Sequence, residues 1–282
     1  MSKSKEFHRP ENWSNAHQLL KRSDVTTIPL IVGPRPTALY DLDAEAFVDL
    51  EKLQLNYINV GEDERVHIGA MTTLQDLYLS DLLKKQANGI LVDAAYFSAT
   101  LGLRNLATLA GAITNPENPP DIALVLMALD AVVTVQIDEK QTRKVTMTEW
   151  MKDCSQVLLP GEIIREVSFF PQTGTVGSLI RINRTPRDRA ILATAAVLEV
   201  EGDVCKTARL ALAGANLNPV RLPEVEGLLS GQKLTSHLLD QAAAAAEKQA
   251  KPVADYRGSV AYRKAMAGVL SKRALTQAFK AN

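Results

Sequence analysis

LRNLATLAGAITNPENPPDIALVLMALDAVV, residues 103–133, is the stretch that decides how this chain folds. Its first half is rich in small residues around Gly111, which let a backbone approach a neighbouring group closely, and three prolines without an N–H follow. Asp121 then stands where a helix N-cap belongs, before the apolar helix IALVLMALD, and AVVTVQID alternates as a strand does. The stretch therefore predicts an irregular loop, built for close approach, that leads into a buried helix and a strand.

Length and composition favour about two domains and argue against a nucleic-acid role. The chain has 282 residues, and 32 Lys+Arg balance 32 Asp+Glu, so no charge excess points to nucleic acid or an anionic membrane. Cys154 and Cys205 belong to no CxxC or Cys/His cluster, which predicts free thiols rather than a zinc or iron–sulfur site. The N-terminus has no apolar signal core, and no run of about 18 apolar residues could span a bilayer. We expect a cytoplasmic protein.

The periodicity divides the chain into three segments that mix helices and strands. Residues 1–60 are predicted as a small αβ lobe, in which TTIPLIVG is a strand that leads into GPRPT. Residues 61–172 are predicted as a second αβ lobe that closes with the strand EIIREVSFF. After PQTGTVGS, which is typical of a boundary, residues 176–282 place three strands before three helices. The predicted class is α+β.

Two loops are candidates for holding a phosphate: GPRPT at 33–37 and TLAGAITNPENPPD at 108–121. Backbone N–H groups in Gly-rich turns and at helix N-termini bind anions, although ordinary turns explain this spacing equally well. The chain has no GxGxxG, Walker A, GxSxG or HExxH motif, and its four histidines are scattered. No catalytic acid, base or nucleophile is therefore predicted.

The stretch at 103–133 resembles a segment of the FAD-binding medium subunit of molybdenum hydroxylases, the family of xanthine dehydrogenase and carbon monoxide dehydrogenase type. That segment reads IRNvATlGGNI, then a Pro and an Asp, then an LLALDA helix. PLIVGPRPT occupies the place of the family's LLAGGTD loop, VHIGAMTTLQDL that of its IGAmtt segment, and DYRGSVAYRKAMAGVLSKRAL resembles its closing helix. With several stretches in the same order, the chain is identified as a member of this family.

The resemblance implies a two-lobed FAD-binding domain of the vanillyl-alcohol-oxidase type, followed by a smaller α+β C-terminal domain. It implies a subunit that relays electrons from the iron–sulfur clusters of one partner through FAD to NAD or another acceptor, while a third subunit holds the molybdenum cofactor. The cofactor-binding positions that it implies are Val32, Gly33, Pro34, Arg35, Thr37, Arg104, Asn105, Thr108, Leu109, Gly111, Thr114, Asp121 and Asp188.

Both loops depart from the family's pattern. Prolines at 34 and 36 leave two positions of the first turn without an N–H, and Ala110 and Ala112 replace a glycine and an asparagine in the second. Arg35 could offset the lost donors by pairing with a pyrophosphate oxygen. Each missing hydrogen bond to a charged group weakens binding by roughly 1.5 to 3 kcal/mol. A flavin-free subunit that keeps the fold for assembly of the complex is therefore the second hypothesis.

Ordinary structural roles stand beside the functional ones. Arg104 would equally tie down an irregular backbone, and capping is favoured over a ligand contact for Asp121. Glu162 is expected on the solvated side of a strand. Tyr256 and Tyr262 could pack at a flavin or at a subunit face, and packing in the core is favoured over either. The match to the family's pattern can be shifted by one position in this stretch, so Arg189 is an alternative to Asp188 as a cofactor-binding position.

Overall fold

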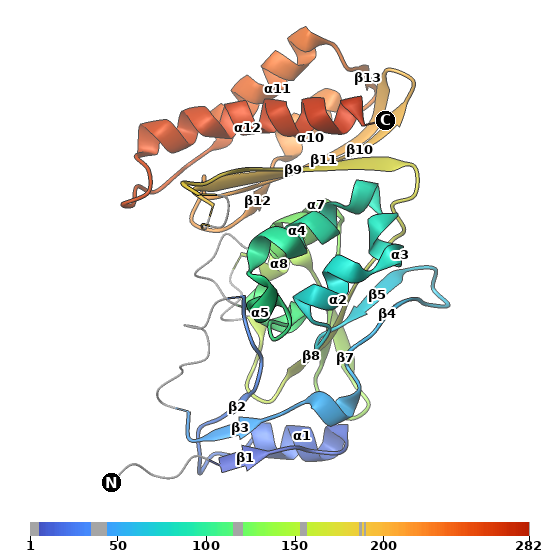
Figure 1. Cartoon of the computed structure of the whole chain (residues 1–282), viewed down its shortest axis with the longest axis vertical. Coiled ribbons are helices and arrows are strands. Elements are labelled where there is room, and N and C mark those ends of the chain that lie inside the picture. The colour runs from blue at the N-terminus through green and yellow to red at the C-terminus, as the bar shows by residue number, and fades with distance from the viewer. Residues whose placement is uncertain are drawn as a thin grey trace.

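Three sheets, with helices packed between and against them, make up the protein (Figure 1). The computed structural model describes residues 6–34, 44–114, 121–152, 157–185, 188 and 190–281. The N-terminal lobe lies at one end of the long axis, the C-terminal sheet and its helices at the other, and the second lobe between them. The predicted α+β class is confirmed.

The first lobe is a small parallel sheet covered by one helix. Its strands run in the order β1 (Glu6–His8), β3 (Ala46–Val48) and β2 (Thr27–Pro29), and α1 (Trp13–Leu20) starts where the side chain of Asn12 accepts from Asn15 N. The predicted strand TTIPLIVG is regular only as far as Pro29, which has no N–H for the ladder. Leu30 N still donates to Val48 O at 2.8 Å, and two residues further on Val32 O accepts from Thr108 N, so the chain passes here from the first sheet to the second lobe.

The second lobe is an antiparallel sheet with its helices on one side. The strand order is β4 (Ile58–Val60), β5 (Val66–Gly69), β8 (Ile163–Phe169), β6 (Val132–Gln136) and β7 (Thr142–Thr146). Because β4 pairs with β5, residues 58–60 lie in this sheet rather than in the first lobe. Short 3-10 turns occupy Glu51–Leu53 and Ala87–Gly89. The helices are α2 (Leu74–Leu79), α3 (Asp81–Lys84), α4 (Ile90–Ser98), α5 (Leu101–Arg104), α6 (Leu109–Thr114), α7 (Asp121–Ala128) and α8 (Met147–Trp150).

Two of these helices replace the irregular stretch expected at LRNLATLAGAIT. Residues 109–113 are all buried, and a helix satisfies their backbone groups where water cannot reach. Every residue of α7 is buried as well, in keeping with its apolar sequence.

The C-terminal sheet has helices on both faces. Its order is β12 (Val220–Arg221), β11 (Val204–Ala213), β10 (Leu192–Glu201) and β9 (Thr175–Ile182), with β13 (Gln232–Lys233) also on β11. Along β10, Leu192, Ala196 and Leu198 pack toward α10 (Pro223–Leu229), α11 (Ser236–Gln249) and α12 (Val260–Lys280). Ala193, Ala195 and Val197 point the other way, into the core of the second lobe beside α4 and α7. Because β9 starts at Thr175, part of the boundary expected at PQTGTVGS is strand.

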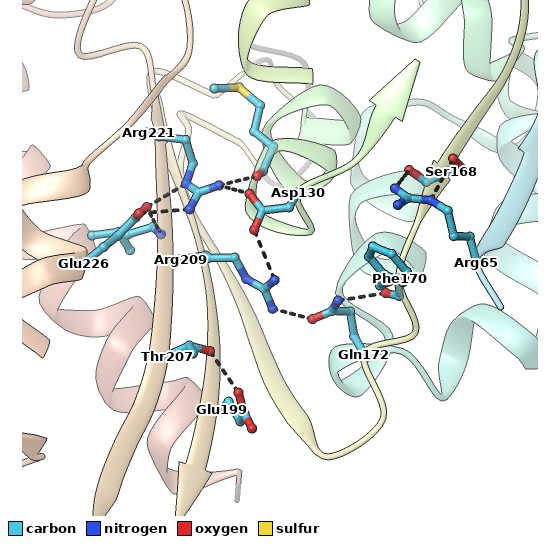
Figure 2. Close-up of polar contacts among 12 residues, drawn as sticks. Arg65, Asp130, Ser168, Phe170, Gln172, Glu199, Thr207, Arg209, Arg221 and Glu226 are labelled. Carbon is cyan, nitrogen blue, oxygen red and sulfur yellow. Dashed lines mark hydrogen bonds and ion pairs between the residues drawn. The ribbon is translucent and has the colours of Figure 1, made fainter. Parts of the chain in front are cut away.

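A polar network also joins the C-terminal sheet to the second lobe, as Figure 2 shows. Asp130 follows α7 and accepts from Arg209 at 3.2 Å and from Arg221. Arg221 donates in addition to Met127 O at 2.9 Å and binds Glu226 with two nitrogens, at 2.6 and 2.9 Å. Arg209 also donates to Gln172 in the link between β8 and β9. The C-terminal end of α7 is therefore fastened to strands β11 and β12.

Candidate functional site

The two loops singled out in the sequence lie against each other. Thr108 N donates to Val32 O at 2.8 Å. A Cβ added to Gly111 would lie 2.0 Å from Val32 O, so the loops touch at a distance that only glycine permits. Gly33 and Pro34 are both buried at this junction. The close approach expected at Gly111 is real, but its partner is the backbone of the first loop.

Backbone donors of the second loop are used within the protein. Leu109 N donates to Thr72 O and Ala110 N to Ala70 O, both at 2.9 Å. Gly111 N donates to Thr108 Oγ1 at 3.2 Å, and Thr114 Oγ1 to Ala110 O at 2.9 Å. Within the ranges that the structure describes, the N–H of Gly33 has no acceptor. The second loop therefore supplies shape, and Gly33 supplies a backbone donor.

Arg104 fastens three helices together. Its Nε donates to Gln75 Oε1 at 2.9 Å, and its Nη1 donates to Tyr96 O at 3.3 Å and Ala99 O at 3.0 Å. The guanidinium also lies over the ring of Tyr78. These contacts match the structural role weighed for Arg104, while Asn105, just after α5, is exposed.

Asp121 and Asp188, separate in sequence, are linked by Arg181 of β9. Arg181 Nε lies 3.0 Å from Asp121 Oδ2, and its Nη2 donates to the backbone carbonyl of Asp188 at 3.3 Å. The ring of Phe97 in α4 lies 5.1 Å from the guanidinium. Both charged side chains of the ion pair are almost fully buried, with exposed fractions of 5% for Asp121 and 7% for Arg181. A buried cation thus lies where the second lobe meets the C-terminal domain.

Sequence reasoning did not single out Arg181. The available signal was an arginine within the apolar strand TVGSLIRI, since a charged side chain in a buried strand needs a partner.

A small apolar cavity lies beside the loops. Pro29, Ile31, Ala70, Ala110 and Ile163 are among the residues that line it. Its walls continue directly from the contact between the two loops, because Ala110 N donates to Ala70 O.

Glu162, which also lines this cavity, is buried rather than exposed to solvent as expected. It was predicted on the solvated side of a strand, but it is 7% exposed and accepts from Arg143 Nε at 3.0 Å. Burial raises the pKa of the Glu162 carboxyl, but the hydrogen bonds and charge of Arg143 outweigh burial and bring the pKa below its ordinary value. Glu162 thus contributes a satisfied carboxylate to the lining of this cavity.

Tyr256 and Tyr262 were expected in the core, and this prediction is wrong. They are 83% and 41% exposed, because they lie in and just after the loop that precedes α12. Cys205, in contrast, is a buried free thiol as predicted, and burial raises its pKa to about 11.

Three of the residues singled out in the sequence are not among those that the structure describes. Arg35, Thr37 and Cys154 lie outside the described residues. Among those that are described, no group of three or more His, Cys, Asp or Glu side chains could hold a metal ion. None of the helices in the same ranges has the length and apolar character needed to cross a membrane.

Comparison with known proteins covers nearly the whole chain. The model of the FAD binding domain in molybdopterin dehydrogenase matches residues 3–173, and that of the CO dehydrogenase flavoprotein C-terminal domain matches residues 180–278.

Individual relatives agree with these matches. The chain is 31% identical to the 6-hydroxypseudooxynicotine dehydrogenase complex subunit alpha of Paenarthrobacter nicotinovorans, over 77% of this chain and 73% of that protein. It is 28% identical to the carbon monoxide dehydrogenase medium chain of Afipia carboxidovorans, over 97% and 96%. A solved chain of the carbon monoxide dehydrogenase of Hydrogenophaga pseudoflava superposes with a TM-score of 0.87 at 27% identity, covering 98% of this chain and 97% of that one.

Proposed function

We propose that this chain, which belongs to the family of FAD-binding domains in molybdopterin dehydrogenases, relays electrons through FAD within a molybdenum-hydroxylase-type complex. Relatives are described as the medium chain or as one subunit of a dehydrogenase complex, which supports a multi-subunit setting. Its partners would be an iron–sulfur subunit and a molybdenum-cofactor subunit, with NAD or another molecule as the electron acceptor. We also propose that the FAD-binding unit ends near residue 172 and that the C-terminal domain begins with β9, because β8 and β9 belong to different sheets.

The residues present fit a flavin nucleotide. The observation that carries the proposal is the meeting of Asp121, Arg181 and Asp188 beside Phe97, where a buried guanidinium lies next to an aromatic ring. A flavin that takes up electrons gains negative charge, which a nearby fixed cation stabilises. The N–H of Gly33, next to the junction of the two loops, could donate to a phosphate of such a cofactor.

Different residues would serve the cofactor in different ways. Gly33, Asp121, Arg181 and Asp188 would hold it or set its charge environment. The loop residues Val32, Thr108, Leu109, Gly111 and Thr114 would fix the shape of the site through their mutual contacts. Bound FAD would supply the redox chemistry, whereas the protein would bind and orient it.

An FAD titration followed by flavin fluorescence tests the proposal. We expect saturable quenching with the purified protein, and at least about tenfold weaker binding in Arg181→Met. Arg65→Met is the matched control, because it removes a guanidinium that also stacks on a phenylalanine, Phe170, at 4.2 Å, but on the sheet of the second lobe. If the purified protein is colourless and ignores FAD at high concentration, the flavin-free assembly subunit is the better description. Equal weakening by both variants would mean that Arg181 has no special role.

A further inference from the structure

Two tyrosine rings lie in contact at the surface of the second lobe. Tyr78 belongs to α2 and Tyr96 to α4, and their ring centroids are 5.5 Å apart with an angle of 32° between the ring planes. Tyr96 is 39% exposed, and Tyr78 is half-buried. Among the residues that the structure describes, no other two tyrosine rings contact each other. The pair therefore combines close contact with access from solvent.

Arg104 holds the two rings together. Its guanidinium carbon lies 5.1 Å from the centroid of the Tyr78 ring and 5.2 Å from that of the Tyr96 ring. Its Nε donates to Gln75 Oε1 in α2 at 2.9 Å, and its Nη1 donates to Tyr96 O in α4 at 3.3 Å. The two helices also pack against each other (Figure 1). Because one buried arginine ties both helices, the fold itself sets the contact between the rings.

Two phenols held in contact have a characteristic chemistry towards one-electron oxidants. The oxidant takes an electron from a phenol, and the O–H proton passes to water, which leaves a phenoxyl radical with unpaired spin on its oxygen and ortho carbons. Two such radicals join through a new C–C bond between ortho carbons, and each ring then passes its ortho hydrogen to its oxygen. With hydrogen peroxide as the final electron acceptor, two phenols and one peroxide give one biphenol and two waters.

The surroundings of the tyrosine pair suit this reaction. The exposed part of Tyr96 lets an oxidant take an electron and water take the proton. Because the proton leaves with the electron, the radical is uncharged, and no like charge forms beside the guanidinium of Arg104. Fast side-chain motion brings the ortho carbons of rings already in contact to bonding distance. Coupling within the chain thus has a large advantage in effective concentration over coupling between two chains.

We propose that Tyr78 and Tyr96 form an oxidative coupling site, at which a one-electron oxidant of the haem-peroxidase class, supplied with hydrogen peroxide, links α2 to α4 through a dityrosine. The Phe97 ring lies 5.4 Å from the ring of Tyr96 and 5.1 Å from the guanidinium of Arg181. The link would therefore fix α4 beside the candidate cofactor site. The coupling itself needs no flavin, so it goes beyond the proposed function and does not depend on it.

Peptide mapping of the oxidised chain tests the coupling site. The full-length chain, in dilute solution, is treated with a haem peroxidase and hydrogen peroxide, and chains of monomer mass are isolated by denaturing electrophoresis. Trypsin places Tyr78 in the peptide 66–84 and Tyr96 in the peptide 86–104. We expect these two peptides to be joined, with a mass lower than their sum by two hydrogen atoms.

Single phenylalanine variants identify the residues that couple. Tyr78→Phe and Tyr96→Phe keep the ring and remove the hydroxyl, so each should lower the dityrosine fluorescence of the monomer at least about tenfold. Tyr262→Phe is the matched control, because Tyr262 is 41% exposed, close to the value for Tyr96, and contacts no other tyrosine ring in the described part of the chain. It should leave the fluorescence unchanged.

Three results would overturn the coupling site. The first is a link between the two peptides that occurs only in dimers, which would mean coupling between chains. The second is oxidation of Tyr256, which is 83% exposed, while the peptides 66–84 and 86–104 stay unlinked. The third is a cross-linked chain whose melting temperature does not rise. A link preset by the fold restricts only the unfolded chain and should therefore raise the melting temperature.

Discussion

Asp121 and Arg181 form a buried ion pair, with Oδ2 of the carboxylate 3.0 Å from Nε of the guanidinium, between the first residue of α7 and strand β9. Taking either charge out of water alone costs several kcal/mol, so each residue is tolerated there because of the other. The pair joins the second lobe to the C-terminal domain at the candidate cofactor site. It holds a cation in place before any cofactor arrives.

Removing one member of this pair should cost more than removing both charges. We expect Arg181→Met to lower the free energy of unfolding by about 3 to 5 kcal/mol, because it leaves the Asp121 carboxylate buried without its cation. The double variant Asp121→Asn/Arg181→Met should recover part of that loss. Urea denaturation of the four proteins of this cycle measures the coupling, and additive single effects would contradict it.

Gly111→Ala should disturb the contact between the two loops. The new methyl would meet Val32 O, a backbone atom that cannot turn away, so we expect a loss of about 1 to 3 kcal/mol in unfolding free energy. Gly102→Ala is the control within the neighbouring helix α5, because a Cβ there has no neighbour within 4 Å. It should stabilise by up to about 1 kcal/mol. Similar thermal melts for both variants would show that the loops tolerate separation.

His67 should make stability depend on pH. Its Nε2 lies 2.8 Å from Asp63 Oδ1 and its Nδ1 3.0 Å from Glu166 Oε1. Burial lowers the pKa of His67, but the two carboxylates outweigh it and raise the pKa above the ordinary value of 6.5. A raised folded-state pKa stabilises below the unfolded-state value, and the gain is lost as pH rises through the folded-state value. The stability difference between the parent chain and His67→Gln should therefore be larger at about pH 6 than at about pH 8.5. Urea midpoints at the two pH values measure it, and a constant difference would count against the ion pairs.

The two carboxylates that accept from Arg221, those of Glu226 and Asp130, should contribute unequally. Arg221→Met removes the two hydrogen bonds that Arg221 donates to Glu226, whose side chain is only 15% exposed and then accepts only from Leu210 N, and we expect a loss of about 2 to 3 kcal/mol. Asp130→Asn should cost less than about 1 kcal/mol, because Asp130 is 56% exposed and water replaces its ion pairs. Asparagine also tolerates the positive φ of 52° at this position. Guanidinium titrations of both variants measure the difference, and the reverse order would contradict this account.

Where the local sequence pattern agreed with the tertiary packing, the sequence was sufficient to predict the helix or strand. The apolar run after Asp121 predicted α7, and the three strands predicted in the first part of residues 176–282 correspond to β9, β10 and β11. LRNLATLAGAIT was expected to be irregular because small residues give no helical periodicity. Burial of 109–113 makes α6 helical all the same, since backbone groups that water cannot reach must find their partners within the protein.

The candidate site was only partly foreseen, because its decisive contacts join distant segments. Val32 and Gly111, which the resemblance implied, do meet, and so do the stretches around Asp121 and Asp188. Arg181 escaped notice because its partner lies sixty positions away. Glu162 was expected in water for the same reason, since Arg143 comes from another strand. Tyr256 shows the opposite error: an aromatic residue was assigned to the core by type, whereas arginine pairs hold it outside.

Both faces of the C-terminal sheet are covered, one by α10, α11 and α12 and the other by the second lobe. Residues 193, 195 and 197 of β10, with 211 and 213 of β11, complete the core of the preceding lobe. A fragment cut between residues 173 and 180, where one family match ends and the next begins, would expose this whole apolar face. Such a fragment should aggregate or remain partly unfolded. We therefore expect the two units to fold as one, and exchanges between relatives at this boundary should succeed only if they carry α4 and α7 along with the sheet.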